Sequence, residues 1–167
     1  KGTNEGIRRA LEDHGAAYVV TLNNDTRVDP EFLRELAKAA SSDRIGMVQS
    51  KLLFMDRPRI LNTTAVSPGR DGSGVDRGWN EVDEGQYDGA TDIFAVTAGA
   101  ALYRRNVFDT VGLFDDDFVA YLEDLDLSWR ARLAGWEARF APESIVYHKY
   151  SASSSYQSAW KTYQGER

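Results

Sequence analysis

The chain has 167 residues, of which 42% are hydrophobic and 28% charged, a composition typical of one globular domain with its own core. Its net charge of −6 argues against nonspecific nucleic-acid binding, which requires a basic surface. The sequence contains no cysteine, so disulfides, zinc–thiolate sites and thiol nucleophiles are excluded. No apolar run reaches the length of a membrane span, and no signal peptide is recognisable.

Helices and strands alternate in the first third of the chain. The pattern predicts a helix over 4–14, a strand over 17–22, a helix over 30–40 and a strand over 45–54. Asn4 is a suitable N-cap for the first helix and Gly15 a suitable end, while Asp29 and Pro30 suit the start of the second. This alternation predicts an α/β fold with a mixed, mostly parallel sheet flanked by helices.

The middle of the chain changes character. Residues 67–74 read as a flexible loop by composition, and they lack the Gly-Lys-Ser/Thr ending of a P-loop. A polar and aromatic segment follows up to residue 90, which is either a surface excursion or a substrate-facing loop.

The last third returns to regular elements. It predicts strands over 92–97 and 100–103, a helix over 104–111, a helix that ends at Gly135, and strands over 136–140 and 145–150. Pro142 is expected to end the first of the last two strands. The apolar face of the longer helix is expected to comprise Leu122, Leu125, Trp129 and Leu133.

A polar turn follows the strand over 17–22. Asn23, Asn24, Asp25 and Thr26 lie between that strand and the next helix. Ligands of open α/β sheets bind just beyond the carboxyl ends of strands, and Asp25 is at such an end. A single Asp in a turn of this kind is more often structural, so this loop alone does not define a site.

Acidic residues gather in a second stretch. Six of them fall between residues 115 and 126, and Glu123 and Asp124 lie in the first turn of the predicted helix. A favourable interaction with the helix dipole explains one or two of these carboxylates. Because the others repel one another, we expect a cation or a ligand to compensate their charge. His148 ends a late strand, and carboxylate oxygen together with imidazole nitrogen suits Mn²⁺, or Mg²⁺ with a phosphate-bearing substrate.

The motifs, taken in order, resemble the family 2 glycosyltransferases of the GT-A fold, and most closely the rhamnosyltransferase-like branch that builds bacterial surface polysaccharides. The motifs that carry the resemblance are Leu22-Asn23-Asn24-Asp25-Thr26, Gly99-Ala100-Ala101-Leu102-Tyr103-Arg104-Arg105, Phe114-Asp115, Tyr121-Leu122-Glu123-Asp124-Leu125-Asp126-Leu127-Ser128-Trp129-Arg130 and His148. The resemblance implies a GT-A catalytic domain over 1–150 and the start of a C-terminal extension over 151–167. It also implies that the family's first strand–helix–strand unit, which holds the nucleobase, is missing here, so that the domain is N-terminally truncated.

The resemblance also implies roles for single residues. Asn23, Asn24 and Asp25 match the DXD position beside the donor diphosphate, with Asn23 in place of the usual first Asp. Asp25 and His148 would bind Mn²⁺ or Mg²⁺. Gly99 and Ala100 match the floor of the sugar pocket.

The Glu-Asp motif matches the catalytic centre of the family. Asp124 would be the base that deprotonates the acceptor hydroxyl, and Glu123 would help to orient the acceptor or the loop. Trp129 is expected to pack inward, and Arg130 to pair with Asp126 one helical turn away.

The resemblance thus implies an inverting enzyme of bacterial surface polysaccharide synthesis, a hexosyltransferase of rhamnosyltransferase type. It would move a sugar from a dTDP- or UDP-linked donor to a glycan or lipid-linked acceptor. It further implies a cytoplasmic location at the inner face of the membrane, with peripheral membrane contact through the missing C-terminal part. Exposed strand edges favour a homodimer.

Two alternatives remain open from the sequence. One is a noncatalytic sugar- or metal-binding module derived from the GT-A fold. The other is a metal-dependent phosphodiesterase, which would need further metal ligands from the acids at 115–117.

Overall fold

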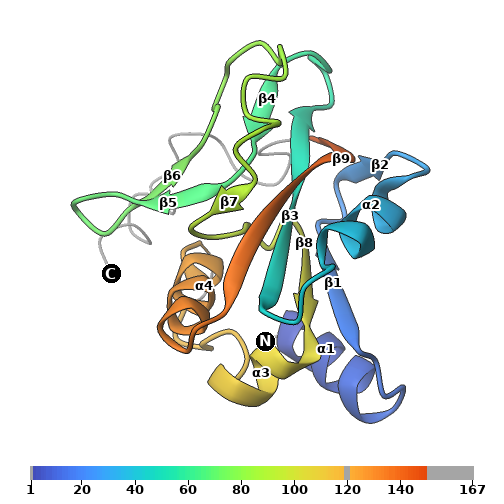
Figure 1. The fold of residues 1–167 in the computed structure, drawn as a ribbon, viewed down its shortest axis with the longest axis vertical. Helices are drawn as coiled ribbons and strands as arrows, with labels where there is room; N and C mark the ends of the chain where they lie inside the picture. The colour runs from blue at the N-terminus through green and yellow to red at the C-terminus, as the bar shows by residue number, and fades with distance from the viewer. Residues whose placement is uncertain (1, 119–120, 150–167) are drawn as a thin grey trace.

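The computed structural model describes residues 2–118 and 121–149 (Figure 1). Its elements are α1 (Gly2–Glu12), β1 (Tyr18–Leu22), β2 (Thr26–Val28), α2 (Phe32–Ala39), β3 (Ile45–Phe54), β4 (Leu61–Thr63), β5 (Val66–Pro68), β6 (Gly74–Asp76), β7 (Asp92–Ile93), β8 (Ala100–Arg104), α3 (Arg105–Val111), α4 (Glu123–Leu133) and β9 (Glu137–His148). The expected C-terminal extension over 151–167 lies outside the described residues.

The described strands form one seven-stranded mixed sheet and a separate two-stranded hairpin. The large sheet has the order β1-β8-β3-β9-β2, with β4 also paired to β3 and β7 to β9. The predicted mixed α/β sheet is confirmed, but the expectation that it is mostly parallel is wrong. Within the described part of the chain, β3 and β9 pair in parallel and the other pairings are antiparallel. Alternation of strands and helices does not determine strand direction. Here β8 lies between β1 and β3 and runs antiparallel to both.

Strand β9 replaces two strands that the sequence predicts as separate. Its pairing with β3 shifts register between Ser50↔Ala141 and Lys51↔Ile145, so that the segment between these partners forms a bulge. Pro142 therefore does not end the strand, because in a bulge its missing N–H group breaks no ladder hydrogen bond. Ser144 stabilises the bulge by donating its hydroxyl to the carbonyl of Phe32, at 3.0 Å.

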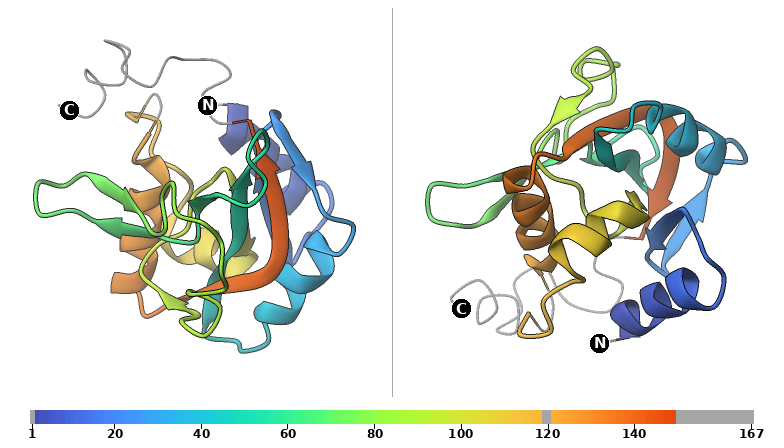
Figure 2. Two further views of the ribbon diagram at one scale, coloured as in Figure 1. Left: turned by 90° about the horizontal axis from the view of Figure 1, so that it is seen from above. Right: turned by 60° about the horizontal axis from the view of Figure 1, so that its bottom comes forward.

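Helices cover both faces of the sheet (Figures 1 and 2). On one face α1, α3 and α4 pack around Tyr103, Met47 and Phe140. On the other face α2 packs with Leu36 against Val48 and neighbouring strand residues. Because adjacent residues of a strand point to opposite faces, each central strand contributes to both cores.

Two expectations about helices are wrong. Asn4 does not cap a helix; it is buried within α1, where its amide donates to the carbonyl of Phe114 at 2.8 Å and so ties α1 to the loop before α4. Trp129 does not pack inward, because 44% of it is exposed and its ring meets Phe94 edge-on at 5.2 Å. The buried face of α4 includes the small residues Ser128 and Ala131, which let the helix approach the sheet closely. The predicted pair of Arg130 with Asp126 is present at 2.7 Å.

The stretch predicted to be a flexible loop forms a β-hairpin instead. Strands β5 and β6 pair in register from Val66↔Asp76 to Pro68↔Gly74. In the turn, Asp71 accepts hydrogen bonds from both the backbone N–H and the hydroxyl of Ser73. Val66 also packs on Leu125 of α4, so a local turn motif and one apolar contact fix a segment whose composition suggests a loop.

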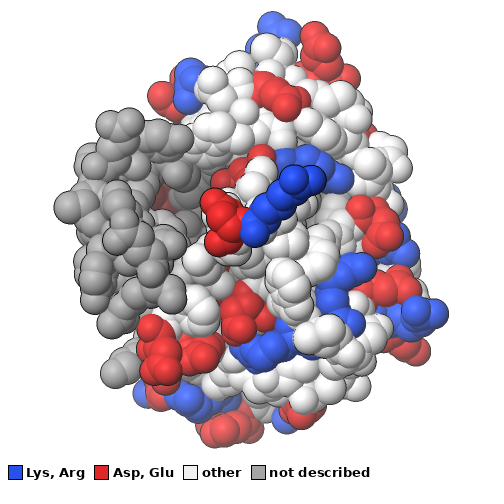
Figure 3. Space-filling view, turned by 90° about the vertical axis from the view of Figure 1, so that its left-hand side faces the viewer, with Lys and Arg blue, Asp and Glu red and all other residues white. Residues whose placement is uncertain are grey.

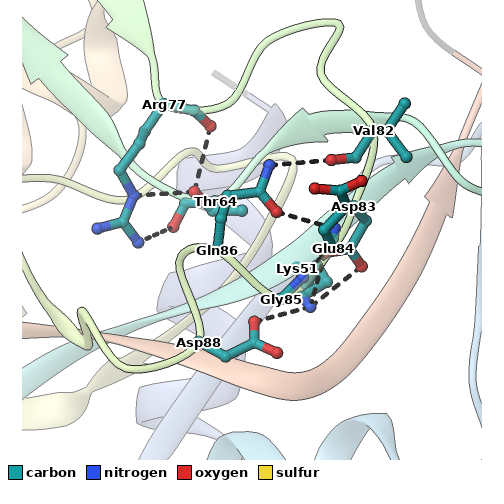
Figure 4. Close-up of polar contacts among 9 residues, drawn as sticks. All are labelled: Lys51, Thr64, Arg77, Val82, Asp83, Glu84, Gly85, Gln86 and Asp88. Carbon is teal, nitrogen blue, oxygen red and sulfur yellow. Dashed lines mark hydrogen bonds and ion pairs between the residues drawn. The ribbon is translucent and has the colours of Figure 1, made fainter.

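The polar segment after the hairpin is tied to the sheet by a buried lysine (Figure 4). The ammonium group of Lys51 in β3, with 6% of its side chain exposed, lies 3.1 Å from Asp83 and 2.8 Å from Asp88. Burial acts to lower the pKa of Lys51, but its contacts with Asp88 and Asp83 outweigh this and raise the pKa above its usual value. Nearby, Arg77 donates to the hydroxyl of Thr64 at 2.9 Å. This segment is thus an anchored part of the fold.

The surface bears charges of both signs. On the face that carries the hairpin, acidic and basic side chains lie interspersed (Figure 3). Among the described helices, none is long and apolar enough to cross a membrane.

We expect Lys51→Met to lower the free energy of unfolding by about 2–3 kcal/mol, because two carboxylates lose the cation between them. The effect is smaller than for a fully buried pair, since the side chain of Asp88 is 38% exposed. Urea denaturation at neutral pH measures it. Lys38→Met is the matched control: Lys38 is exposed and its partner Glu35 keeps Arg34, so the expected loss is under about 1 kcal/mol. Equal losses in the two variants would contradict this role of Lys51.

Candidate active site

Strand pairing brings Asp25 and His148 together from opposite ends of the chain. Thr26 of β2 pairs with His148, the last residue of β9, and the N–H of Lys149 donates to the carbonyl of Asp25 at 2.9 Å. The Nε2 atom of His148 lies 3.3 Å from Oδ1 of Asp25 and 3.3 Å from the amide nitrogen of Asn23. The sheet thus gathers three of the residues that the sequence predicts for the donor site.

Asn62 of β4 orients the imidazole ring of His148. Its Oδ1 lies 2.8 Å from Nδ1 of His148, and because a carbonyl oxygen can only accept, Nδ1 carries the proton. Burial lowers the pKa of His148, while the Asp25 carboxylate acts to raise it. The ring is therefore neutral near pH 7, with the lone pair of Nε2 directed toward Asp25 and Asn23. The sequence analysis did not identify Asn62, although a buried Asn within a strand is an unusual enough feature to mark it.

The pair suits a divalent cation in chemistry and spacing. Adjacent ligands of a six-coordinate Mg²⁺-like ion, each about 2.1 Å from it, are about 3 Å apart, close to the spacing of Asp25 and His148. Carboxylate oxygen is a ligand that suits Mg²⁺ and Mn²⁺, and imidazole nitrogen is a ligand of transition-metal ions. Within the described residues, no group of three His, Asp or Glu side chains converges, so the acids at 115–117 do not join this pair as a two-metal site requires.

The carboxylate of Asp124 is held by backbone N–H groups at the start of α4. Its Oδ2 accepts from Ala98 and its Oδ1 from Leu125, both at 2.9 Å. Burial raises the pKa of Asp124, and the hydrogen bonds from Ala98, Thr97 and Leu125 act against this without cancelling it. The carboxyl group is therefore fixed in place and more basic than an exposed Asp.

The backbone before Asp124 is strained. Tyr121 and Leu122 are both left-handed with φ of 68°, a conformation that costs residues with side chains of order 1–3 kcal/mol each. The side chain of Glu123 follows, and its Oε2 is buried without a hydrogen-bond partner in the described structure. Burial and the neighbouring Asp124 raise the pKa of Glu123. Backbone strain and an unpartnered carboxyl oxygen both lower stability, and both features are found most often at functional sites.

Residues 97–99 connect the two halves of the site. The carbonyl of Gly99 accepts the N–H of Asn23 at 3.0 Å, while Ala98 holds Asp124. The N–H of Thr97 donates to the buried side chain of Gln49 at 2.6 Å, which anchors the segment to β3. A methyl group on Gly99 would meet no atom closer than 3.5 Å, so the fold itself does not demand glycine there.

A cavity of about 450 Å³ contains most of these groups. It is lined by Asn23, the β5–β6 hairpin, residues 97–99, residues 121–125 and His148. Asp25 contacts His148 at its margin. Two other predicted site residues are placed differently: Asn24 is an exposed turn residue, and Ala100 is fully buried in the core beside α2.

The hairpin adds one acid that the sequence analysis did not identify. Asp76, the last residue of β6, is partly buried and lines the cavity with Asp124. Burial raises its pKa to about 6, the hydrogen bond with Thr63 acts to lower it, and the charge of Asp124 adds to the rise. No motif surrounds Asp76 in the sequence, so only the folded hairpin reveals its position.

A second cavity, of about 500 Å³, lies on the other side of the sheet between α2 and β9. Its lining includes Glu35, Lys38 and Arg139. Each of these charged groups already has a partner within the described structure. The cavity contains none of the predicted site residues.

The fold defines the class of protein. It is the GT-A fold of glycosyltransferases: a crystal structure of GalNAc-T7 with UDP, GalNAc and Mn²⁺ superposes with a TM-score of 0.63 at 15% identity, covering 84% of this chain and 29% of that one. The chain belongs to glycosyl transferase family group 2, whose family model matches residues 18–164.

Relatives come from bacteria and plants. The O-antigen biosynthesis protein RfbC of Myxococcus xanthus is 29% identical over 151 residues, which are 86% of this chain and 12% of that protein. A probable glucomannan 4-beta-mannosyltransferase 6 of Oryza sativa subsp. japonica is 28% identical over 80% of this chain and 22% of its own length. The N-acetylglucosaminyl-diphospho-decaprenol L-rhamnosyltransferase of Mycobacterium tuberculosis is 38% identical over 53 residues, 32% of this chain and 17% of that protein. The chain thus spans a small part of the length of these relatives.

The raised pKa of Asp76 predicts a pH-dependent stability difference. The unfolded chain releases this proton near pH 3.8 and the folded chain near pH 6, so ionisation disfavours the folded state as pH rises between these values. The difference corresponds to about 3 kcal/mol, and partial exposure reduces the expected effect to about 2 kcal/mol. Asp76→Asn removes this cost. Thermal unfolding should show the variant gaining stability over the parent from pH 4 to pH 7; a constant difference would contradict the shift.

Proposed function

We propose that this chain forms the catalytic core of an inverting, metal-dependent glycosyltransferase that uses a nucleoside-diphosphate sugar. One observation supports the proposal: the neighbouring side chains of Asp25 and His148, which suit a divalent cation, and the fixed carboxylate of Asp124 lie around one cavity. Membership of glycosyl transferase family group 2 supports the same reaction class.

Asp124 would take the proton from the acceptor hydroxyl. Its carboxylate oxygens keep free lone pairs beside the hydrogen bonds that fix them, and its raised pKa makes it a better base. The acceptor oxygen then forms a bond to the anomeric carbon while the bond from that carbon to the diphosphate oxygen breaks. Attack from the face opposite the leaving group inverts the anomeric configuration, and Asp124 holds the proton.

The other end of the cavity would hold the donor. Asp25 and His148 would bind Mn²⁺ or Mg²⁺, which supplies positive charge to a leaving diphosphate. The side-chain amide of Asn23 donates to Nε2 of His148, the nitrogen whose lone pair the cation would take. Gly99 leaves room at the cavity wall where a side chain would reduce the space for a sugar ring.

The names of the relatives support a role in polysaccharide synthesis. We therefore propose a dTDP- or UDP-linked donor sugar, rhamnose among the candidates, and a glycan or lipid-linked acceptor. Such an acceptor favours a cytoplasmic site of action at the inner face of the membrane.

The first test is calorimetric titration of UDP, dTDP and GDP into this chain, with Mn²⁺ and then with EDTA. We expect binding of one nucleotide that EDTA abolishes, because the protein provides only part of the cation's ligands and the diphosphate completes them. Binding of a simple sugar without any nucleotide dependence would favour the noncatalytic module. The same titration with the whole protein separates a bare module from a domain that needs its neighbouring segments.

The second test is Asp124→Asn in the whole protein. We expect the rate of sugar transfer to fall at least about 100-fold, since an amide cannot accept the proton, while nucleotide affinity stays within about threefold. Release of the nucleoside diphosphate measures transfer, and circular dichroism confirms folding. Asp126→Asn is the control: Asp126 lies on the same helix but pairs with Arg130, so this variant should keep its activity. Near-normal turnover in Asp124→Asn would remove the assigned base.

A further inference from the structure

Of the acids that line the cavity, Asp76 has no role in the proposed reaction and none that the family resemblance implies. Asp76 enters the cavity from the β5–β6 hairpin, whereas Asp124 enters it from α4. The hairpin packs on α4 through Val66 and Leu125, so the two carboxyl groups belong to adjoining walls.

The surrounding chain does not neutralise Asp76. Its neighbour Arg77 is directed elsewhere, donating to Thr64 and to the carbonyl of Ala90 and stacking over Tyr87. Among the ion pairs of the described residues, none includes Asp76. Its hydrogen-bond partner is Thr63, whose single hydroxyl proton also lies within reach of the carbonyl of Ala65, so the two oxygens compete for it. A carboxyl group in such surroundings adds little to the stability of the hairpin.

The cavity has two ends. At one end His148 lies 3.3 Å from Asp25, and at the other the β5–β6 hairpin lies against the start of α4, where a methyl group on Gly74 would be 3.5 Å from Leu122 and 3.9 Å from Leu125. Asp76 therefore belongs to the end with the base and not to the end with the cation-binding pair. In the proposed reaction the acceptor sugar occupies the end with the base.

Resting on the proposed function, we propose that Asp76 determines acceptor specificity by binding a hydroxyl group of the acceptor sugar other than the one that Asp124 deprotonates. A sugar presents several hydroxyl groups around one ring. A carboxyl group bonds to a hydroxyl either as acceptor, when ionised, or as donor, when protonated. Two carboxyl groups on adjoining walls would then select both the sugar and the hydroxyl that reacts.

The test uses the whole protein with Mn²⁺, the donor that it accepts, and methyl glycosides of glucose, N-acetylglucosamine, galactose, mannose and rhamnose as acceptors. Release of the nucleoside diphosphate measures transfer, and saturation-transfer NMR with the nucleoside diphosphate and Mn²⁺ present measures binding of each glycoside. We expect Asp76→Ala to raise the acceptor KM about tenfold or more, the effect of losing a hydrogen bond to a carboxyl group, with a smaller change in kcat. Asp76→Asn, which keeps a hydrogen-bonding side chain, should recover part of the loss.

Monodeoxy forms of the best glycoside separate recognition from a structural effect. One deoxy form should lack the hydroxyl group that Asp76 binds. Its affinity for the parent protein should equal the affinity of the intact glycoside for Asp76→Ala, and its own affinity should be the same for both proteins. The control is Val75→Thr, a β-branched replacement at an exposed position next to Asp76, which should leave the KM unchanged.

The outcomes distinguish the two proposals. No metal-dependent nucleotide binding by the whole protein would overturn the proposed function, and the role of Asp76 with it. Normal nucleotide binding with an acceptor KM that Asp76→Ala does not change would overturn the role of Asp76 alone. The role of Asp76 would also be overturned if the protein bound none of the glycosides. It would be overturned too if Asp76→Ala lowered the affinity for every deoxy form equally.

Discussion

The complete burial of β3 constrains the rest of the structure. All ten residues of Ile45–Phe54 are buried, so every backbone group of the strand must find a partner inside the protein. On one side β8 pairs with Met47–Gln49 and β4 pairs with Leu52–Leu53, and on the other side β9 pairs along the full length of the strand. The parallel run of β9 beside β3 carries His148 to the end of the sheet where β2 begins. The proximity of Asp25 and His148, the pair that we propose to bind the cation, is thus a result of strand pairing.

Buried charges are compensated by opposite charges in one part of the molecule and are left without such partners in another. At Lys51 a buried ammonium group faces two carboxylates, and the result is a compensated cluster that holds a surface segment in place. In the cavity, Asp76, Glu123 and Asp124 have raised pKa values, and no lysine or arginine of the described chain pairs with them. Uncompensated carboxyl groups lower stability, and proteins retain them where a ligand or a reaction needs them.

Local signals predicted local features well. The bounds of β3, the polar turn at Asp25 and the acidic first turn of α4 follow from residue types and their spacing, and the structure contains all three. The structure also brings His148 to Asp25, as the family resemblance implies. What the sequence could not provide depends on contacts between distant residues. The direction of β8, the bulge at Pro142 and the exposure of Trp129 are set by neighbours far away in the chain. Asp76 and Asn62 stand in short strands without a motif, so only the fold shows that they approach the site.

The segment Thr97–Ala98–Gly99 has a consequence for the variety of sugars that such a fold can use. The N–H of Ala98 donates to the carboxylate of Asp124 and the carbonyl of Gly99 accepts the N–H of Asn23, so two adjacent residues hold both ends of the candidate site. Consecutive Cα atoms are about 3.8 Å apart whatever side chains they bear. The spacing between the backbone atoms that hold Asp124 and Asn23 is therefore set by the main chain, whatever side chains residues 97–99 carry. In the proposed reaction, diversity in donor and acceptor would arise on the cavity walls, while these two anchor points keep their spacing.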